Sequence, residues 1–97
     1  MRAVEFYEEA WLEIEEAVAW YDAQDVPGLG DRLVRELQTA LRKAKELPKA
    51  FPTIDGRNRR VLLGKFPYGL YFREQDDKIV VVAFFHAKRD PVHRAKR

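Results

Sequence analysis

The chain has 97 residues, of which 46% are hydrophobic and 35% charged, and it contains no cysteine. A chain of this length supplies one hydrophobic core, so we expect a single domain over residues 1–97. The composition excludes a disordered chain, a disulfide framework and a cysteine-ligated metal site. The longest apolar run, residues 79–85, is too short to cross a bilayer. The acidic start predicts no signal peptide, and we therefore expect a cytoplasmic protein.

The charge of the chain is polarised along the sequence. Residues 1–25 contain eight acidic residues and one arginine, a net charge of −7, and since the whole chain carries +2, the remainder carries +9. A basic half of this kind is suited to binding nucleic acid or an acidic partner. The alternative is that both halves are solvated faces without any partner.

The first half of the chain predicts a short strand and a helical hairpin. Residues 3–6 form an extended run, expected as an edge or inserted strand. Residues 8–24 and about 29–47 are expected to be helices, because their apolar residues recur at spacings of three and four. The first stripe contains Ala10, Trp11, Ile14, Ala17, Val18 and Tyr21. The second contains Leu33, Val34, Leu37, Ala40, Leu41, Ala44 and Leu47. The sequence VPGLG breaks the two helices, and Pro48 ends the second.

The second half predicts a three-stranded antiparallel meander over residues 59–85, where three runs rich in Val, Leu, Ile, Phe and Tyr are separated by Gly, Pro or acidic residues. Residues 49–58 form a connecting loop, anchored by Phe51 and Ile54. The expected fold class is therefore α+β: a small single domain in which a strand and a helical hairpin precede the meander, with the hairpin packed on one face of an antiparallel sheet.

A two-residue turn at Asp76 and Asp77 would fix the register of the last hairpin, pairing Phe72 with Val81. Alternation then places one purely apolar set of side chains toward the helices. This set comprises Leu70, Phe72, Ile79, Val81, Ala83 and Phe85. The opposite set would face a ligand and comprises Tyr71, Arg73, Val80, Val82, Phe84 and His86. On this register Arg73 and His86 share one face.

The chemistry of the sequence is basic and aromatic. There is no phosphate loop, HExxH motif or nucleophile elbow. Arginine offers bidentate donors to phosphate and aromatic rings stack on unpaired bases, which favours RNA or single-stranded nucleic acid as the ligand. The residues predicted to bind the nucleic acid or another target are Arg57, Arg59, Arg60, Lys65, Tyr68, Tyr71, Lys88 and Arg94.

Each of these residues also has a plainer interpretation. Arg73 ends a strand beside EQDD and can simply pair with Asp76 or Asp77. His86 can be a hydrogen-bonded structural residue at the strand end. Tyr68 and Tyr71 can be packing residues, and the basic tail can serve solubility alone. These alternatives stay open at the level of the sequence.

Four successive segments carry a resemblance to a known family: EAVAWYDAQ, PGLGDRL, RRVLLGKFPYGLYF and DDKIVVVAFFHAKRDP. Together they resemble the RelE/ParE superfamily of toxins, once called plasmid stabilisation proteins, over nearly the whole chain. The resemblance implies a growth-arresting toxin of a type II toxin–antitoxin module. It implies a cognate antitoxin that wraps and neutralises the toxin, and neither a cofactor nor a membrane.

Members of this superfamily are either ribosome-dependent messenger RNA endonucleases or inhibitors of DNA gyrase. The resemblance implies messenger RNA cleavage on the ribosome, with Arg73, His86 and Arg89 as catalytic residues. The alternatives are a ParE-type gyrase inhibitor and a non-toxic basic binding module. His86 matches a histidine that ends the last strand in some ribonuclease members, which follow it with a tyrosine where this chain has Ala87.

Overall fold

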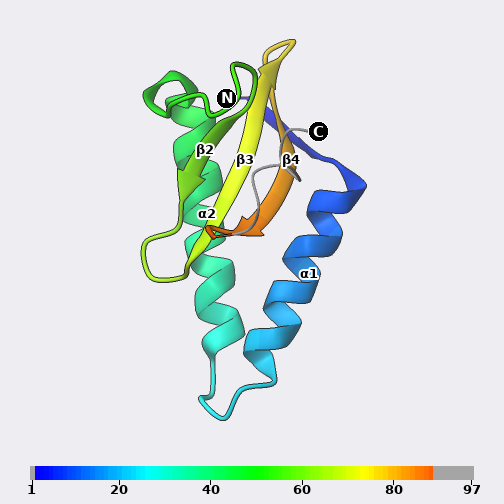
Figure 1. Ribbon diagram of the computed structural model, residues 1–97, viewed down its shortest axis with the longest axis vertical. Coiled ribbons are helices and arrows are strands. Elements are labelled where there is room, and N and C mark those ends of the chain that lie inside the picture. The colour runs from blue at the N-terminus through cyan, green and yellow to red at the C-terminus, as the bar shows by residue number, and fades with distance from the viewer. Residues whose placement is uncertain (1, 89–97) are drawn as a thin grey trace.

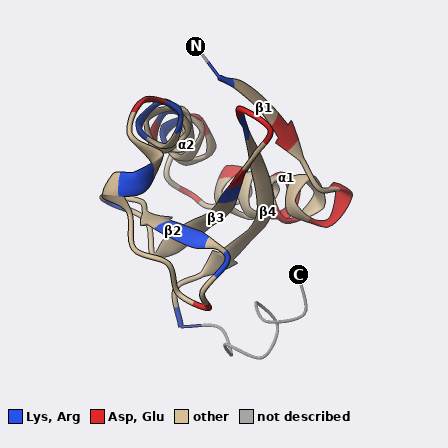
Figure 2. Cartoon of the chain, turned by 90° about the horizontal axis from the view of Figure 1, so that it is seen from above, with Lys and Arg blue, Asp and Glu red and all other residues tan. Residues whose placement is uncertain are grey.

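A computed structural model of the chain describes residues 2–88, in which two α-helices pack on one face of a four-stranded sheet (Figures 1 and 2). In chain order the elements are β1 (Ala3–Phe6), α1 (Glu8–Asp22), α2 (Leu29–Glu46), the short 3-10 helix η1 (Pro48–Ala50), β2 (Arg59–Leu62), β3 (Tyr68–Gln75) and β4 (Lys78–His86). The sheet order is β1-β4-β3-β2. The meander is antiparallel as predicted, and β1 lies at the edge parallel to β4, so the sheet as a whole is mixed.

The helices form where the apolar periodicity predicts them. Glu8 and Glu9 stabilise the positive start of α1. Gly28 precedes α2 with φ 82°, a left-handed conformation that suits glycine. α2 ends at Glu46, so Leu47 lies outside the helix and is 66% exposed, contrary to its predicted place in the buried stripe. Within residues 2–88, no helix combines the length and the apolar character needed to span a bilayer.

The β3–β4 hairpin has the predicted turn. Asp76 and Asp77 have φ 52° and 62°, as a two-residue turn of this type requires. Phe72 pairs with Val81, which confirms the register near the turn. Farther along, the register shifts at the bond between Tyr71 and Phe72, because β4 contains one extra residue there, a β-bulge.

The bulge reverses the predicted facing of the end of β4. Leu70 pairs with Phe84 instead of Ala83. Phe84 therefore belongs to the helix-side core and stacks on Tyr68, while Ala83 and Phe85 lie on the other face. The prediction was wrong beyond the bulge, because strict alternation assumes one residue on each strand at every pair.

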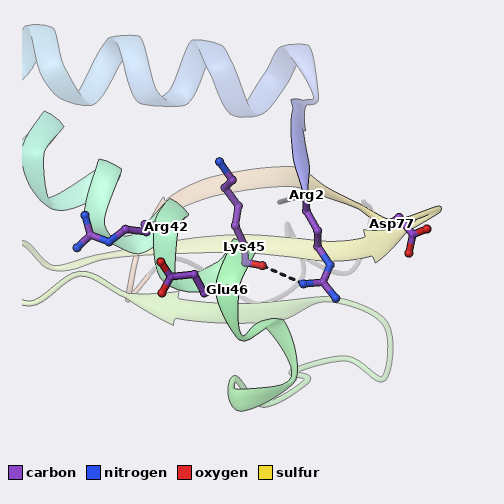
Figure 3. A pocket seen from close by; sticks show the side chains of 5 residues that line it. All are labelled: Arg2, Arg42, Lys45, Glu46 and Asp77. Carbon is purple, nitrogen blue, oxygen red and sulfur yellow. Dashed lines mark hydrogen bonds between the residues drawn. The ribbon is translucent and has the colours of Figure 1, made fainter.

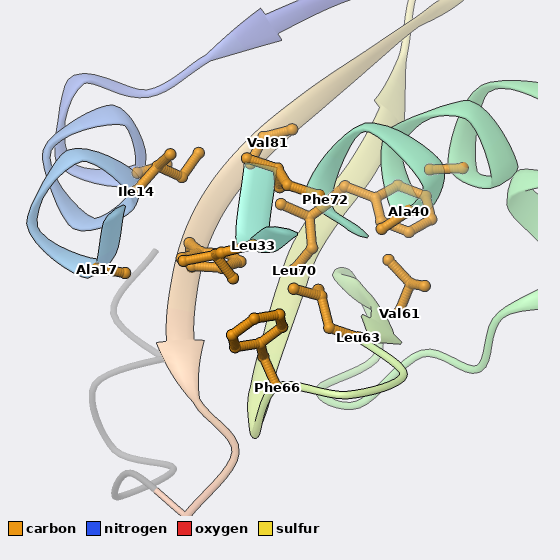
Figure 4. Close-up of a cluster of buried hydrophobic side chains, with 14 of the residues drawn as sticks. Ile14, Ala17, Leu33, Ala40, Val61, Leu63, Phe66, Leu70, Phe72 and Val81 are labelled. Carbon is orange, nitrogen blue, oxygen red and sulfur yellow. The ribbon is translucent and has the colours of Figure 1, made fainter. Parts of the chain in front are cut away.

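The main core lies between the helices and the sheet (Figure 4). Its buried members are Ala10, Ile14, Ala17, Leu33, Leu37, Ala40, Ala44, Val61, Leu63, Phe66, Leu70, Phe72, Ile79, Val81 and Phe84. A smaller cluster, here called the outer cluster, covers the opposite face and contains Tyr71, Val80, Val82, Ala83 and Phe85. The two predicted loop anchors divide between them: Phe51 packs on the main core and Ile54 on the outer cluster. The connecting loop therefore wraps one edge of the sheet.

Candidate functional site

Arg73 is a buried charged residue on the outer face of the sheet. Its side chain is 5% exposed, and its Nη2 donates a hydrogen bond of 2.7 Å to the Tyr7 hydroxyl. The guanidinium carbon lies 5.3 Å from the centroid of the same ring. A buried guanidinium needs such contacts to offset its loss of hydration. Arg73 is thus held at the junction between β1 and α1.

His86 ends β4 and lies beside Tyr68, with the two ring centroids 5.6 Å apart. Its Nδ1 accepts a hydrogen bond of 3.2 Å from the backbone N–H of Lys88. The imidazole is half-buried, with one nitrogen engaged by the backbone. This contact agrees with the plainer interpretation of a hydrogen-bonded strand-end histidine.

Arg73 and His86 do not meet, contrary to the expected shared face. Arg73 pairs with Val80, whereas His86 pairs with Tyr68 at the other end of the hairpin. Six residues of extended chain separate Val80 from His86, which is roughly 20 Å at about 3.3 Å per residue. The bulge also turns His86 toward the side of Tyr68 and Phe84, away from Arg73. One phosphate could not contact both side chains.

The predicted basic residues around β2 have separate environments. Arg59 Nη1 donates to the Phe51 carbonyl over 2.6 Å, so this side chain holds the connecting loop. Arg60 pairs with Tyr71 across the strands and therefore lies on the outer face, as Arg73 does. Arg57 is exposed at the tip of the loop. Only Arg57 and Arg60 of these three keep their guanidinium groups available for a ligand on this side.

The loop at Arg57 is organised by Asp55. The Asp55 carboxylate accepts hydrogen bonds from the backbone N–H groups of Arg57 (3.0 Å) and Asn58 (2.6 Å) and from the Asn58 amide (3.1 Å). Burial acts to raise the pKa of Asp55, but these donors outweigh it and leave the pKa below its ordinary value. The loop therefore relies on an ionised carboxylate.

At the other edge of the sheet, the hydrogen bond to Glu5 raises the pKa of Lys78.

Lys65 belongs to a basic cluster that was not predicted from the sequence. It shares a shallow cavity of about 230 Å³ with Arg32, Arg35, Glu36 and Thr39 of α2. The Lys65 backbone N–H donates to Glu36 Oε1 over 2.9 Å, which ties the β2–β3 loop to the helix. The spacing of Arg32 and Arg35 signals one helix face, but only the tertiary fold brings Lys65 to it.

A second mixed-charge cavity, of about 560 Å³, lies where the chain start meets the end of α2 (Figure 3). It is lined by Arg2, Arg42, Lys45, Glu46 and Asp77. Arg2 Nη1 donates to the Lys45 carbonyl over 2.9 Å, and the Arg2 guanidinium lies 3.6 Å from Glu74. Arg2 thus neutralises the negative end of α2.

The aromatic residues predicted as stacking platforms are packing residues in this fold. Tyr71 is 1% exposed within the outer cluster, and Tyr68 is half-buried against Phe84 with ring centroids 4.9 Å apart. Lys88 is exposed after β4. Arg89 and Arg94 lie outside the described residues. Within residues 2–88, no group of three or more His, Cys, Asp or Glu side chains is arranged to hold a metal ion.

The fold is shared with small toxins of solved structure, all of low sequence identity. A toxin–antitoxin structure described as the chromosomal ParDE system from P. aeruginosa aligns with a TM-score of 0.75 at 13% identity, covering 89% of this chain and 96% of that one. The isolated E. coli RelE toxin aligns with a TM-score of 0.54 at 18% identity, covering 99% and 95%. An E. coli RelE mutant in complex with an antitoxin RelBc peptide gives 0.53 at 15%, covering 99% and 94%.

These structural similarities define the class of the protein: the chain has the fold of the RelE/ParE superfamily of toxins. Residues 4–91 match the family described as the ParE toxin of the type II toxin–antitoxin system parDE. The chain therefore belongs to the ParE toxin family and is a toxin of a type II module. No curated protein matches the chain.

Proposed function

We propose that this toxin arrests growth by binding and inhibiting DNA gyrase, without cleaving RNA. The observation that carries the proposal is the separation of Arg73 from His86 by roughly 20 Å along the sheet. Cleavage through the RNA 2′-hydroxyl requires a proton carrier and a charge-neutralising donor at the same phosphate. The resemblance implied that Arg73, His86 and Arg89 supply these groups, and the distance between Arg73 and His86 argues against their joint action on one phosphate.

Two further features support a binding mechanism. Arg73 is buried and bonded to Tyr7, which suits a structural role better than contact with a substrate. Among the predicted binding residues that the structure describes, the accessible cations are spread over different elements: Arg57 and Arg60 at the β2 edge, Lys65 beside α2, and Lys88 after β4. Separated positive charges attract and orient an acidic surface without needing to transfer a proton.

The test uses the purified toxin with gyrase and relaxed plasmid. We expect loss of supercoiling and accumulation of cleaved plasmid in the gyrase complex. His86→Ala should inhibit gyrase as strongly as the wild type. Arg73→Ala is a poor probe, because removing a buried side chain that holds Tyr7 disturbs the fold.

Expression in cells distinguishes gyrase inhibition from RNA cleavage and from a non-toxic binding module, independently of the assay with purified gyrase. When the toxin is expressed alone from a tight promoter, we expect DNA damage signalling while translation continues. Early arrest of translation with cut messenger RNA, abolished by His86→Ala, would establish the ribonuclease instead. Unimpaired growth with verified soluble protein would leave only a non-toxic binding module or an inactive family member.

A further inference from the structure

A shallow depression, here called the α2 depression, runs along α2 beside the end of β2 and the loop that follows β2. Two cavities of about 230 and 200 Å³ form it, and they adjoin because Glu36 and Thr39 line both. Four cationic side chains also line it: Arg32, Arg35, Lys43 and Lys65. From Arg32 to Lys43 the helix rises roughly 16 Å at about 1.5 Å per residue. The α2 depression is therefore a cationic strip about three helical turns long.

The four cations of the α2 depression are available to a ligand. All four are exposed, and within residues 2–88 no hydrogen bond or ion pair engages their side-chain nitrogens. Glu36 lies four residues after Arg32, but its Oε1 accepts the backbone N–H of Lys65 over 2.9 Å. This bond holds the Lys65 loop against α2. Like charges on one helix face destabilise the helix slightly, so a bound anion would offset a repulsion that the fold leaves uncompensated.

The two helices carry opposite net charge (Figure 2). α1 contains six acidic residues and no basic one, a net charge of −6. α2 contains five basic and three acidic residues, and Lys65 beside it raises the net charge of this side to +3. A polyanion is therefore attracted to α2 and repelled by α1. This difference would orient a bound polyanion along α2, away from α1.

The other lining residues indicate which polyanion fits. Interfaces with proteins centre on buried aromatic or other apolar anchors, and among the lining residues Leu62 is the one large apolar side chain that is exposed. No aromatic ring lines the α2 depression, so an unpaired base would have no platform to stack on. Duplex DNA needs neither feature, because its backbone places a phosphate about every 3.4 Å along each strand. A strip of 16 Å faces roughly five phosphates of one strand.

We propose that the α2 depression binds the phosphate backbone of duplex DNA, without reading its sequence. The phosphate-binding side chains are Arg32, Arg35, Lys43 and Lys65, and Glu36 is a positioning residue that acts through the Lys65 loop. Contacts to phosphates fix the position of a protein on a duplex but carry no sequence information. The toxin would thus bind DNA by itself, which goes beyond inhibition of gyrase.

The first experiment measures the salt dependence of binding. A labelled duplex of 20 base pairs is titrated with the full-length toxin and followed by fluorescence anisotropy. Four phosphate contacts predict a slope of about −3.6 for log K against log salt, and hence a loss of about 150-fold between 50 and 200 mM salt. A single strand of the same length should bind about fivefold more weakly, since its charge density is lower. A slope near zero, or tighter binding of the single strand, would overturn the proposal.

Matched variants locate the contacts. Arg32→Gln and Arg35→Gln should each weaken duplex binding about fivefold at 50 mM salt and reduce the slope by about 0.9. Arg57→Gln removes an exposed cation outside the α2 depression and should leave the slope unchanged. The same loss of slope in Arg57→Gln, with none in the two α2 variants, would place the DNA elsewhere. Circular dichroism verifies that each variant is folded.

A gain of affinity provides a test that misfolding cannot imitate. Glu36 is the one acidic residue that lines the α2 depression. Glu36→Gln removes its charge but keeps an oxygen that can accept the Lys65 N–H. We expect this variant to bind the duplex two- to fivefold more tightly at 50 mM salt, because one repulsion of the phosphates is lost. Unchanged or weaker binding in the folded variant would contradict phosphate contact at this position.

The competing ligand is an acidic protein surface, for which a 20-residue polyglutamate peptide is the probe. If this peptide binds as tightly as the duplex and loses the same affinity in Arg35→Gln, the α2 depression is a site for an acidic protein instead. All of these measurements use the toxin without gyrase. Failure to bind DNA would therefore leave gyrase inhibition to be judged on its own assay, and failure to inhibit gyrase would leave the DNA site standing.

Discussion

The two faces of the sheet are buried in different ways. The face toward α1 and α2 carries an apolar core that two complete helices cover. The opposite face carries the smaller outer cluster, and among the described residues Tyr7 and Ile54 pack against it. Arg73 also lies on this face, bonded to Tyr7. Long periodic elements therefore bury one face of the sheet, whereas burial of the other face depends on single residues of loops and junctions.

The sharpest test of this comparison pairs two buried phenylalanines on neighbouring strands. Phe72 is 0% exposed in the helix-side core and Phe85 is 1% exposed in the outer cluster. We expect Phe72→Ala to lower the free energy of unfolding by about 3–5 kcal/mol. Phe85→Ala should cost about 1–2 kcal/mol less, because the outer cover is smaller and can collapse into the space. If urea melts show that both variants lose the same free energy of unfolding, the two faces are equally rigid.

The second prediction concerns the bulge. Residues 80–82 are three consecutive valines, so deleting one of them removes the extra residue of β4. The pairs of Tyr71 with Ala83 and of Leu70 with Phe84 are then kept in a regular ladder. We expect a folded protein that is less stable by about 1.5–3 kcal/mol, the contribution of one buried valine.

The control for this deletion is the insertion of a fourth valine. A second extra residue must either enlarge the bulge or exchange the facing of Phe84 and Phe85. We expect a larger loss of stability from the insertion than from the deletion. The opposite order, measured by thermal unfolding, would mean that the bulge itself is required.

The smallest predicted effect is a pH dependence from the loop that holds Ile54 against the outer cluster. Because the pKa of Asp55 is lowered by folding, its contribution to stability is complete above about pH 4, the unfolded value. This contribution is lost as the pH falls through the folded pKa. Asp55 is exposed, so Asp55→Asn should cost less than about 1 kcal/mol at pH 7. The difference between variant and wild type should vanish in acid, and a gap that persists at low pH would contradict the role of the charge.

The elements that depend on local chemistry could be predicted from the sequence. Both helices follow from apolar residues at spacings of three and four, and the β3–β4 turn follows from Asp76 and Asp77 between two apolar runs. The register next to that turn was also predictable, since the turn length fixes Gln75 opposite Lys78. These features arise from interactions between residues close in the chain.

The bulge was not predictable, because three identical valines give no sign of which one is extra. The bulge changes the candidate site, because it directs the Phe84 side chain toward the helices. It also places His86 on the face opposite to that of Arg73. The basic cluster of Arg32, Arg35 and Lys65 was missed for a related reason. Its members come from a helix and a strand connection that are distant in sequence and meet only in the folded chain.

The sequence by itself determined the class of this protein, since the order of elements and the segments resembling RelE/ParE toxins are properties of the chain alone. It also determined the charge polarity, which follows from counting residues. Only the tertiary structure decided which charges are available. It buried Arg73 against Tyr7, bound Arg59 to the Phe51 carbonyl, and placed Glu15 among the residues that line an apolar cavity between α1 and α2. The physical reason is that burial and pairing depend on neighbours from other elements, and a single residue in one strand changes those neighbours.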